Sequence, residues 1–97
     1  MYRIEYSPEA IDHLRTLTVR QRALVIDAVE RQLAHQPTAE TVNRKPMRPN
    51  PLAPWELRIG VLRVYYEVTD GEPLVLIRGV GIKQRHQVLF GGKEIAL

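Results

Sequence analysis

The segment from Pro54 to Val68 alternates apolar and polar residues in two runs that meet at Gly60 and Val61. A period of two is typical of a strand with one buried face, so the segment predicts a hairpin that turns at Gly60-Val61. One face of this hairpin holds Trp55, Leu57, Ile59, Leu62, Val64, Tyr66 and Val68. We expect the other face to be exposed to solvent, and it holds Glu56, Arg58, Arg63, Tyr65 and Glu67.

In this register Arg58 lies directly across from Arg63. Like charges that face each other across a ladder destabilise it, so the pair needs a partner. One possibility is an anion such as phosphate, which a guanidinium group can hold with two hydrogen bonds. The other is an ordinary solvated face on which Glu56 and Glu67 neutralise the arginines as cross-strand ion pairs. The alternation alone leaves both possibilities open.

The chain before the hairpin predicts a short strand and two helices. Residues 2–7 alternate, and Ser7 then provides an N-cap with Pro8 at the first helical position. We expect this helix to extend to about Leu17. Thr18 and Gln21 fit a capping box that begins a second helix. The apolar stripes of the two helices are Ile11, Leu14 and Leu17, and Val25, Ile26, Val29 and Leu33.

Prolines and glycines divide the rest of the chain. Five of the seven prolines lie between residues 37 and 54, and this stretch predicts a long surface loop without regular structure. Asp70-Gly71 predicts a second turn, and residues 74–77 are apolar on both faces, as in a central strand. Gly91-Gly92 predicts a last small hairpin. Residues 1–97 therefore predict a single α+β domain of order β-α-α-β-β-β with a short C-terminal element, in which an N-terminal strand and an antiparallel two-helix pair pack on a mainly antiparallel sheet.

Composition narrows the chemistry. The 97 residues include no cysteine and three scattered histidines, which predicts no disulfide, no thiolate chemistry and no metal site. We expect His13 and His35 to be surface residues on the helices without a role. No signal segment and no apolar run of about 18 residues is present, so we expect a cytoplasmic protein without membrane contact.

Positive charge is concentrated in the second half of the chain. Residues 1–40 hold five Lys and Arg against six Asp and Glu, whereas residues 41–97 hold nine against five. Such a one-sided basic field is typical of domains that bind nucleic acid or an acidic partner, although it also occurs on a merely solubilising surface. The candidate nucleic-acid contacts outside the arginine pair are Arg44, Lys45, Tyr65, Arg78 and Arg85. Among them, Tyr65 would stack on a base.

The order strand, two helices, "NRKP" (43–46), "WELRIGVLRVYYEV" (55–68), apolar strand and "GIKQRHQ" (81–87) resembles the RelE/ParE superfamily of toxins from bacterial type II toxin–antitoxin modules. The resemblance covers nearly the whole chain and is closer to RelE-like members. It implies a small endoribonuclease without metal or cofactor that cuts mRNA, often on the ribosome, by attack of the RNA's own 2′-hydroxyl. It also implies a cognate antitoxin that wraps the toxin, for which we expect an acidic binding segment.

The resemblance assigns roles position by position. Arg63 matches the arginine that RelE-like toxins use on the phosphate, and Lys83 matches a second basic position, with Arg58 beside them. Glu56 stands where a lysine is usual and Leu89 where a tyrosine is usual, so His86 or Glu56 would act as general base. We expect Phe90 to be a core or strand-edge residue. Two alternatives to the nuclease stay open: a ParE-type inhibitor of DNA gyrase, and an inactive relative that binds only its antitoxin.

Overall fold

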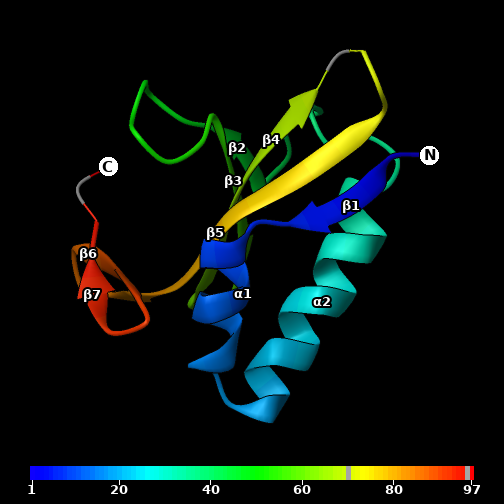
Figure 1. Ribbon diagram of the computed structural model, residues 1–97. Coiled ribbons are helices and arrows are strands. Elements are labelled where there is room, and N and C mark those ends of the chain that lie inside the picture. Colours follow the sequence, from blue (N-terminus) through cyan, green and yellow to red (C-terminus); the bar gives the residue numbers. More distant parts are fainter. Residues whose placement is uncertain (70, 96) are drawn as a thin grey trace.

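The computed structural model describes residues 1–69, 71–95 and 97. Asp70, half of an expected turn, lies outside these residues. The helices and strands are β1 (Arg3–Tyr6), α1 (Pro8–Arg15), α2 (Val19–Leu33), β2 (Arg44–Pro46), β3 (Trp55–Ile59), β4 (Leu62–Thr69), β5 (Leu74–Gln84), β6 (Gln87–Phe90) and β7 (Lys93–Glu94). The α+β class is confirmed (Figure 1). In the described part of the chain, no helix is long and apolar enough to cross a bilayer.

The strands form one sheet in the order β2-β3-β4-β5-β6-β7, antiparallel throughout, and β1 pairs in parallel with the first part of β5. The predicted central strand is confirmed, because β5 lies between β4 and β1 at its start and between β4 and β6 at its end. The hairpin register is also confirmed. Arg58 lies opposite Arg63, and the chain turns at Gly60, whose φ of 58° suits a residue without a side chain.

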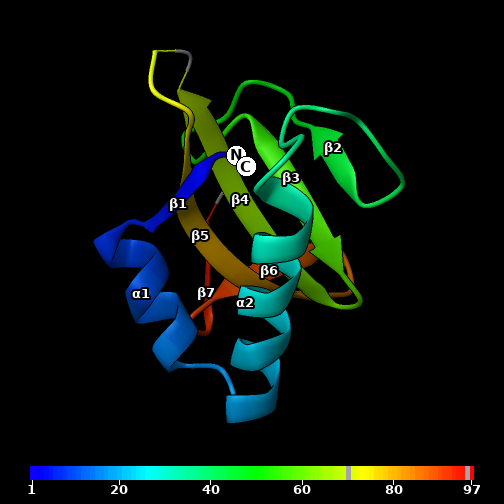
Figure 2. The same ribbon diagram turned by 90° about the vertical axis from the view of Figure 1, so that its right-hand side faces the viewer.

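Both helices cover one face of the sheet, as Figure 2 shows. Their starts are as predicted: Ser7 Oγ accepts a hydrogen bond from the Ala10 amide at 3.1 Å, and Thr18 and Gln21 form a reciprocal capping box. The helix α1 is shorter than predicted and ends at Arg15. These caps satisfy amides that the first turn of a helix cannot pair internally.

A main core fills the space between the helices and the sheet. The strands contribute Leu57, Val64, Tyr66, Val75 and Ile77, all without exposed surface. Two predictions about the helices are wrong, since Ile11 and Ile26 are exposed by 41% and 38%. The smaller Ala10 and Ala28 are buried in the helix–sheet contact and allow close packing there.

We predicted that the face of the sheet opposite the helices is exposed to solvent, and this prediction is wrong. Ala53, Tyr65 and Phe90 form a second core there, against which Met47, Leu52, Val88 and Ile95 pack. The strand β6 reaches this face because β5 has glycines where the two approach. A Cβ atom at Gly81 would lie 2.6 Å from Val88 Cγ1 and 2.8 Å from the Leu89 carbonyl oxygen. Phe90 is therefore a core residue, as expected.

The proline-rich stretch contains a short strand, which corrects the prediction that it lacks regular structure. Residues Arg44–Pro46 form β2 at the edge of the sheet, antiparallel to β3. Proline cannot donate to a ladder, so a strand limited to this edge and to three residues fits the composition. The stretch is anchored to the core by the Tyr66 hydroxyl, which donates to the Pro37 carbonyl at 2.6 Å.

Candidate functional site

Basic side chains from four adjacent strands share the face of the sheet opposite the helices. Lys45 on β2 pairs with Glu56 on β3, and two residues further along β3 Arg58 pairs with Arg63 on β4. Arg63 in turn pairs with Gly81 on β5, two residues before Lys83. Because neighbouring strands lie about 4.8 Å apart, these cations cross the sheet over roughly 15 Å. A row of this kind suits an extended polyanion.

Arg58 and Arg63 lie in register, but their guanidinium groups have different partners. Arg58 Nε donates to Glu56 Oε1 at 2.7 Å, an ion pair along β3 rather than the cross-strand pair of the solvated-face alternative. Arg63 Nη1 donates instead to the carbonyl oxygens of Gly60 at 2.6 Å and Leu62 at 3.0 Å. Within residues 1–69, 71–95 and 97, Arg63 has no carboxylate partner. Its charge therefore stays uncompensated at the end of the hairpin.

Glu56 is held by a buried tyrosine as well as by Arg58. The Tyr65 hydroxyl donates to Glu56 Oε2 at 2.7 Å, and the Tyr65 side chain has no exposed surface. Burial, and next the hydrogen bond to Glu56, raise the pKa of Tyr65, so the phenol stays protonated and remains a donor. The expectation that Tyr65 stacks on a base is wrong, because Phe90 and Ala53 cover the ring. Glu56, expected on a solvated face, is 9% exposed.

Several of the other predicted RNA contacts are engaged within the protein. Arg78 pairs with Glu67 at 3.3 Å, and Lys45 pairs with Glu40 at 3.6 Å. Arg44 faces the helices, where its guanidinium donates to the carbonyl oxygens of Gln32 at 2.6 Å and Ala39 at 3.0 Å. Because Gln32 lies in the last turn of α2, Arg44 caps that helix rather than extending into solvent.

The turn between β5 and β6 presents a second group of basic side chains. Lys83, Arg85 and His86 are all exposed, and Arg85 has a φ of 58° at the tip of the turn. The Lys83 amide donates to the Val61 carbonyl at 2.7 Å, which fixes this turn beside the β3–β4 hairpin. The structure therefore brings Arg63 and Lys83 to the same end of the sheet, with His86 three residues beyond Lys83.

His13 has a structural role that the sequence did not reveal. Its Nδ1 accepts a hydrogen bond from the Val80 amide at 3.2 Å, and its ring centroid lies 5.3 Å from that of Phe90. Burial lowers the pKa of His13, and this outweighs the opposite effects of Asp12 and Glu9. The expectation of a surface residue without a role is wrong for His13, whereas His35 is exposed.

The loop from Met47 to Pro54, here called the proline loop, is built around one asparagine. Asn50 Oδ1 accepts from the amides of Leu52 at 2.8 Å and Ala53 at 3.0 Å. Its Nδ2 donates to the carbonyl oxygens of Arg48 at 2.8 Å and Ala53 at 2.9 Å. The Met47 amide closes the loop on the Pro54 carbonyl at 2.8 Å. Because one side chain satisfies four backbone groups, the loop is preorganised.

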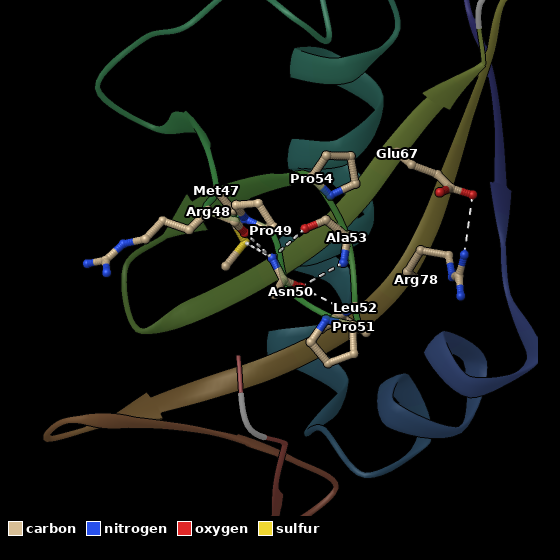
Figure 3. Close-up of a pocket in the computed structure, with 10 residues that line it drawn as sticks. All are labelled: Met47, Arg48, Pro49, Asn50, Pro51, Leu52, Ala53, Pro54, Glu67 and Arg78. Carbon is tan, nitrogen blue, oxygen red and sulfur yellow. Dashed lines mark hydrogen bonds and ion pairs between the residues drawn. The ribbon is translucent and has the colours of Figure 1, made fainter.

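Two clefts adjoin the proline loop. The first, of about 400 Å³, lies between the loop and the Glu67–Arg78 ion pair (Figure 3). Arg48 extends to the other side of the loop, away from that ion pair, as Figure 3 also shows. There it lines the second cleft, of about 610 Å³, together with Lys45 and Arg58. Arg48 was not predicted as a site residue, although its position between Pro46 and Pro49 in a basic stretch is a signal for an exposed cation.

Metal ligands are not grouped in the described part of the chain: no three histidine, aspartate or glutamate side chains lie close enough together to hold an ion. The side chains that the site offers to a ligand are guanidinium and ammonium groups, one buried carboxylate and an exposed imidazole. The guanidinium and ammonium groups can bind phosphate, and an imidazole can serve as a general base.

Comparison with known proteins establishes the fold of the chain. No protein-family model and no curated protein sequence matches it. Among solved structures, a chain of the toxin–antitoxin complex RelBE2 from Mycobacterium tuberculosis superposes with a TM-score of 0.73 and 24% sequence identity. The match covers 84% of this chain and 98% of that chain. At this identity the likeness concerns the architecture, and the chain has a RelE-like fold.

Proposed function

We propose that this chain is the toxin of a toxin–antitoxin pair and that it inhibits translation as an endoribonuclease that cleaves mRNA. The observation that carries the proposal is the Arg63 guanidinium, which has no carboxylate partner among the described residues and lies beside Lys83 at one end of a sheet with a RelE-like fold. A cognate antitoxin is the proposed partner, since the RelBE2 structure is a toxin–antitoxin complex.

The proposed reaction uses the RNA's own 2′-hydroxyl as nucleophile. The 2′-oxygen loses its proton and forms a bond to the adjacent phosphorus while the bond from phosphorus to the 5′-oxygen breaks. The leaving 5′-oxygen takes a proton from water, so the products are a 2′,3′-cyclic phosphate and a free 5′-hydroxyl. Negative charge grows on the non-bridging oxygens in the transition state, where the Arg63 guanidinium and the Lys83 ammonium would stabilise it. One such contact is typically worth a factor of about 100 or more in rate.

The proton of the 2′-hydroxyl needs an acceptor. Both Glu56 oxygens already accept hydrogen bonds, from Arg58 and Tyr65. His86 is exposed at the β5–β6 turn, and histidine is the side chain that most often acts as a general base. We therefore assign the general base to His86, and Glu56 orients Arg58.

Expression of the chain without its partner in a bacterium tests the proposal. Growth should stop, and methionine incorporation should fall before thymidine incorporation. Primer extension on mRNA from these cells should find new 5′ ends, and Arg63→Ala should abolish them. Methionine incorporation that continues during growth arrest would contradict the proposal.

A ParE-type gyrase inhibitor is the second candidate, favoured by one observation. Glu56, Glu40 and Glu67 pair with Arg58, Lys45 and Arg78, and Tyr65 is buried, so the face offers fewer unpaired cations than predicted and no stacking ring from β4. In this case thymidine incorporation should fall first, and purified protein should inhibit DNA supercoiling by gyrase. An Arg63→Ala variant should then keep its toxicity.

A further inference from the structure

The two clefts beside the proline loop differ in the number of cations that line them. In the first cleft the side chains of Glu67 and Arg78 neutralise each other in their ion pair, and Arg48 lines this cleft as well. The second cleft is lined by Lys45, Arg48 and Arg58 together with Glu56, which pairs with Arg58, whereas Glu40 pairs with Lys45. In the described part of the chain Arg48 has no carboxylate partner. An anion bound by Arg48 therefore has two further cations within reach in the second cleft, Lys45 and Arg58, and one in the first, Arg78.

The size and walls of the second cleft suit one nucleotide. Its volume of about 610 Å³ lies within the usual range of about 300–1,000 Å³ for small-molecule sites. Pro46, Met47 and Pro49 supply apolar wall surface against which a base can lie. The loop that carries Arg48 is held by Asn50, so binding does not require it to become ordered.

The cleft is continuous with the candidate catalytic site. Arg58 lines the cleft and also lies opposite Arg63 in the β3–β4 register. An RNA strand with one phosphate at Arg63 therefore has only one strand spacing, about 4.8 Å, to cross before it reaches the wall of the cleft. A chain of regularly spaced phosphates and flat bases matches this alternation of cations and apolar surface better than an acidic peptide does.

We infer that the second cleft holds the nucleotide next to the cleavage point, with its phosphate on Arg48 and Lys45 and its base against Met47. This inference rests on the proposed ribonuclease function and adds a substrate-binding residue, Arg48, to it. The cleavage site and the cleft that binds the flanking nucleotide are then separate parts of one RNA-binding surface, so binding and cleavage can be tested separately.

The test measures binding of a short single-stranded RNA whose 2′-hydroxyls are all methylated, because this RNA lacks the nucleophile and stays intact. Fluorescence anisotropy gives the affinity between about 50 and 200 mM salt for the wild type and for Arg48→Gln. The matched control is Arg20→Gln, which removes an exposed cation from α2 on the helical side. The Arg48 backbone carbonyl still accepts from Asn50 in the variant, and thermal melting checks that the loop is kept.

We expect Arg48→Gln to weaken binding several-fold and to reduce the slope of log affinity against log salt by about 0.7, the value for one phosphate contact on a single strand. The control should leave both quantities unchanged. An unchanged slope in Arg48→Gln overturns the inference, as does a wild type that binds no RNA. An Arg48→Gln variant that weakens only the complex with the antitoxin also overturns it and assigns the cleft to a protein partner.

Failure of the inference can be told apart from failure of the proposed function. Arg48-dependent binding without any cleavage of unmodified RNA refutes the nuclease and leaves the RNA cleft standing. Cleavage by a protein whose Arg48→Gln variant binds like the wild type refutes the cleft and leaves the nuclease standing.

Discussion

Replacing Arg63 by alanine should separate activity from stability. In the free protein the guanidinium makes two local hydrogen bonds, to the carbonyls of Gly60 and Leu62, at the partly exposed end of the hairpin. Such bonds contribute about 1 kcal/mol at most, and loss of the like charge opposite Arg58 offsets a few tenths. The net change in the free energy of unfolding should therefore stay within about 1 kcal/mol, or about 4–8 °C in the melting temperature of a domain of this size.

The effect of Arg63→Ala on catalysis should be larger. If Arg63 stabilises the charge that develops on the phosphate, its loss removes about 3 kcal/mol from transition-state binding, which is a hundredfold or more in rate. Arg63→Lys should recover little, since an ammonium group cannot make two parallel hydrogen bonds to phosphate. The assay is single-turnover cleavage of a labelled RNA, with urea unfolding of the same preparations.

Two outcomes would refute this account of Arg63. A folded Arg63→Ala variant that cleaves RNA at the wild-type rate would remove Arg63 from the site. A loss of stability well above 2 kcal/mol would show that the side chain has a buried partner, contrary to its contacts with the turn. Arg20→Ala on α2 is the matched control and should change neither quantity.

Three further predictions concern the buried polar groups. Tyr65→Phe should lower the free energy of unfolding by about 1.5–3 kcal/mol in urea titrations, because Glu56 loses a buried donor; an unchanged midpoint would contradict the contact. Tyr6→Phe should be neutral or stabilising, since the Tyr6 hydroxyl is buried without a partner in the described part of the chain and burial raises its pKa to about 12. Burial lowers the pKa of His13, so the unfolded chain binds a proton more readily and stability should fall as the pH drops below ~6.5. His13→Asn keeps an acceptor for the Val80 amide and should flatten this decline between pH 7.5 and 5.5; an equal slope in both proteins would rule out His13 as its source.

Local signals explain which parts of the fold the sequence predicted correctly. The Ser7 and Thr18 caps and the turn at Gly60 depend on residues within four positions of one another, and all three are found as predicted. The wrong predictions that Ile11 and Ile26 are buried have a related cause. The three-residue spacing selected large apolar side chains such as Ile11, whereas a close helix–sheet contact buries small ones such as Ala10.

Alternation along β3 and β4 could not reveal whether the second face of the sheet is covered. The cover comes from the proline loop and from Phe90, 25 residues after Tyr65, and their approach depends on Gly79 and Gly81. Polar residues at Glu56 and Tyr65 suggested a solvated face, yet each satisfies the other inside the second core. An alternation of apolar and polar residues cannot predict that two polar side chains will form a hydrogen bond with each other inside a core.

The buried pair explains why two arginines can lie side by side on the candidate site. Tyr65 packs between Phe90 and Ala53 and donates a hydrogen bond to one oxygen of Glu56. The other oxygen accepts a hydrogen bond from Arg58, two residues further along β3. Arg58 is thereby neutralised and directed towards the second cleft, so it does not need to share an anion with Arg63. The second core is in this way a scaffold for the site, since it separates a neutralised cation that faces the cleft from a free cation that faces the end of the sheet. A phosphate at Arg63 then meets a guanidinium group whose charge no carboxylate has already compensated.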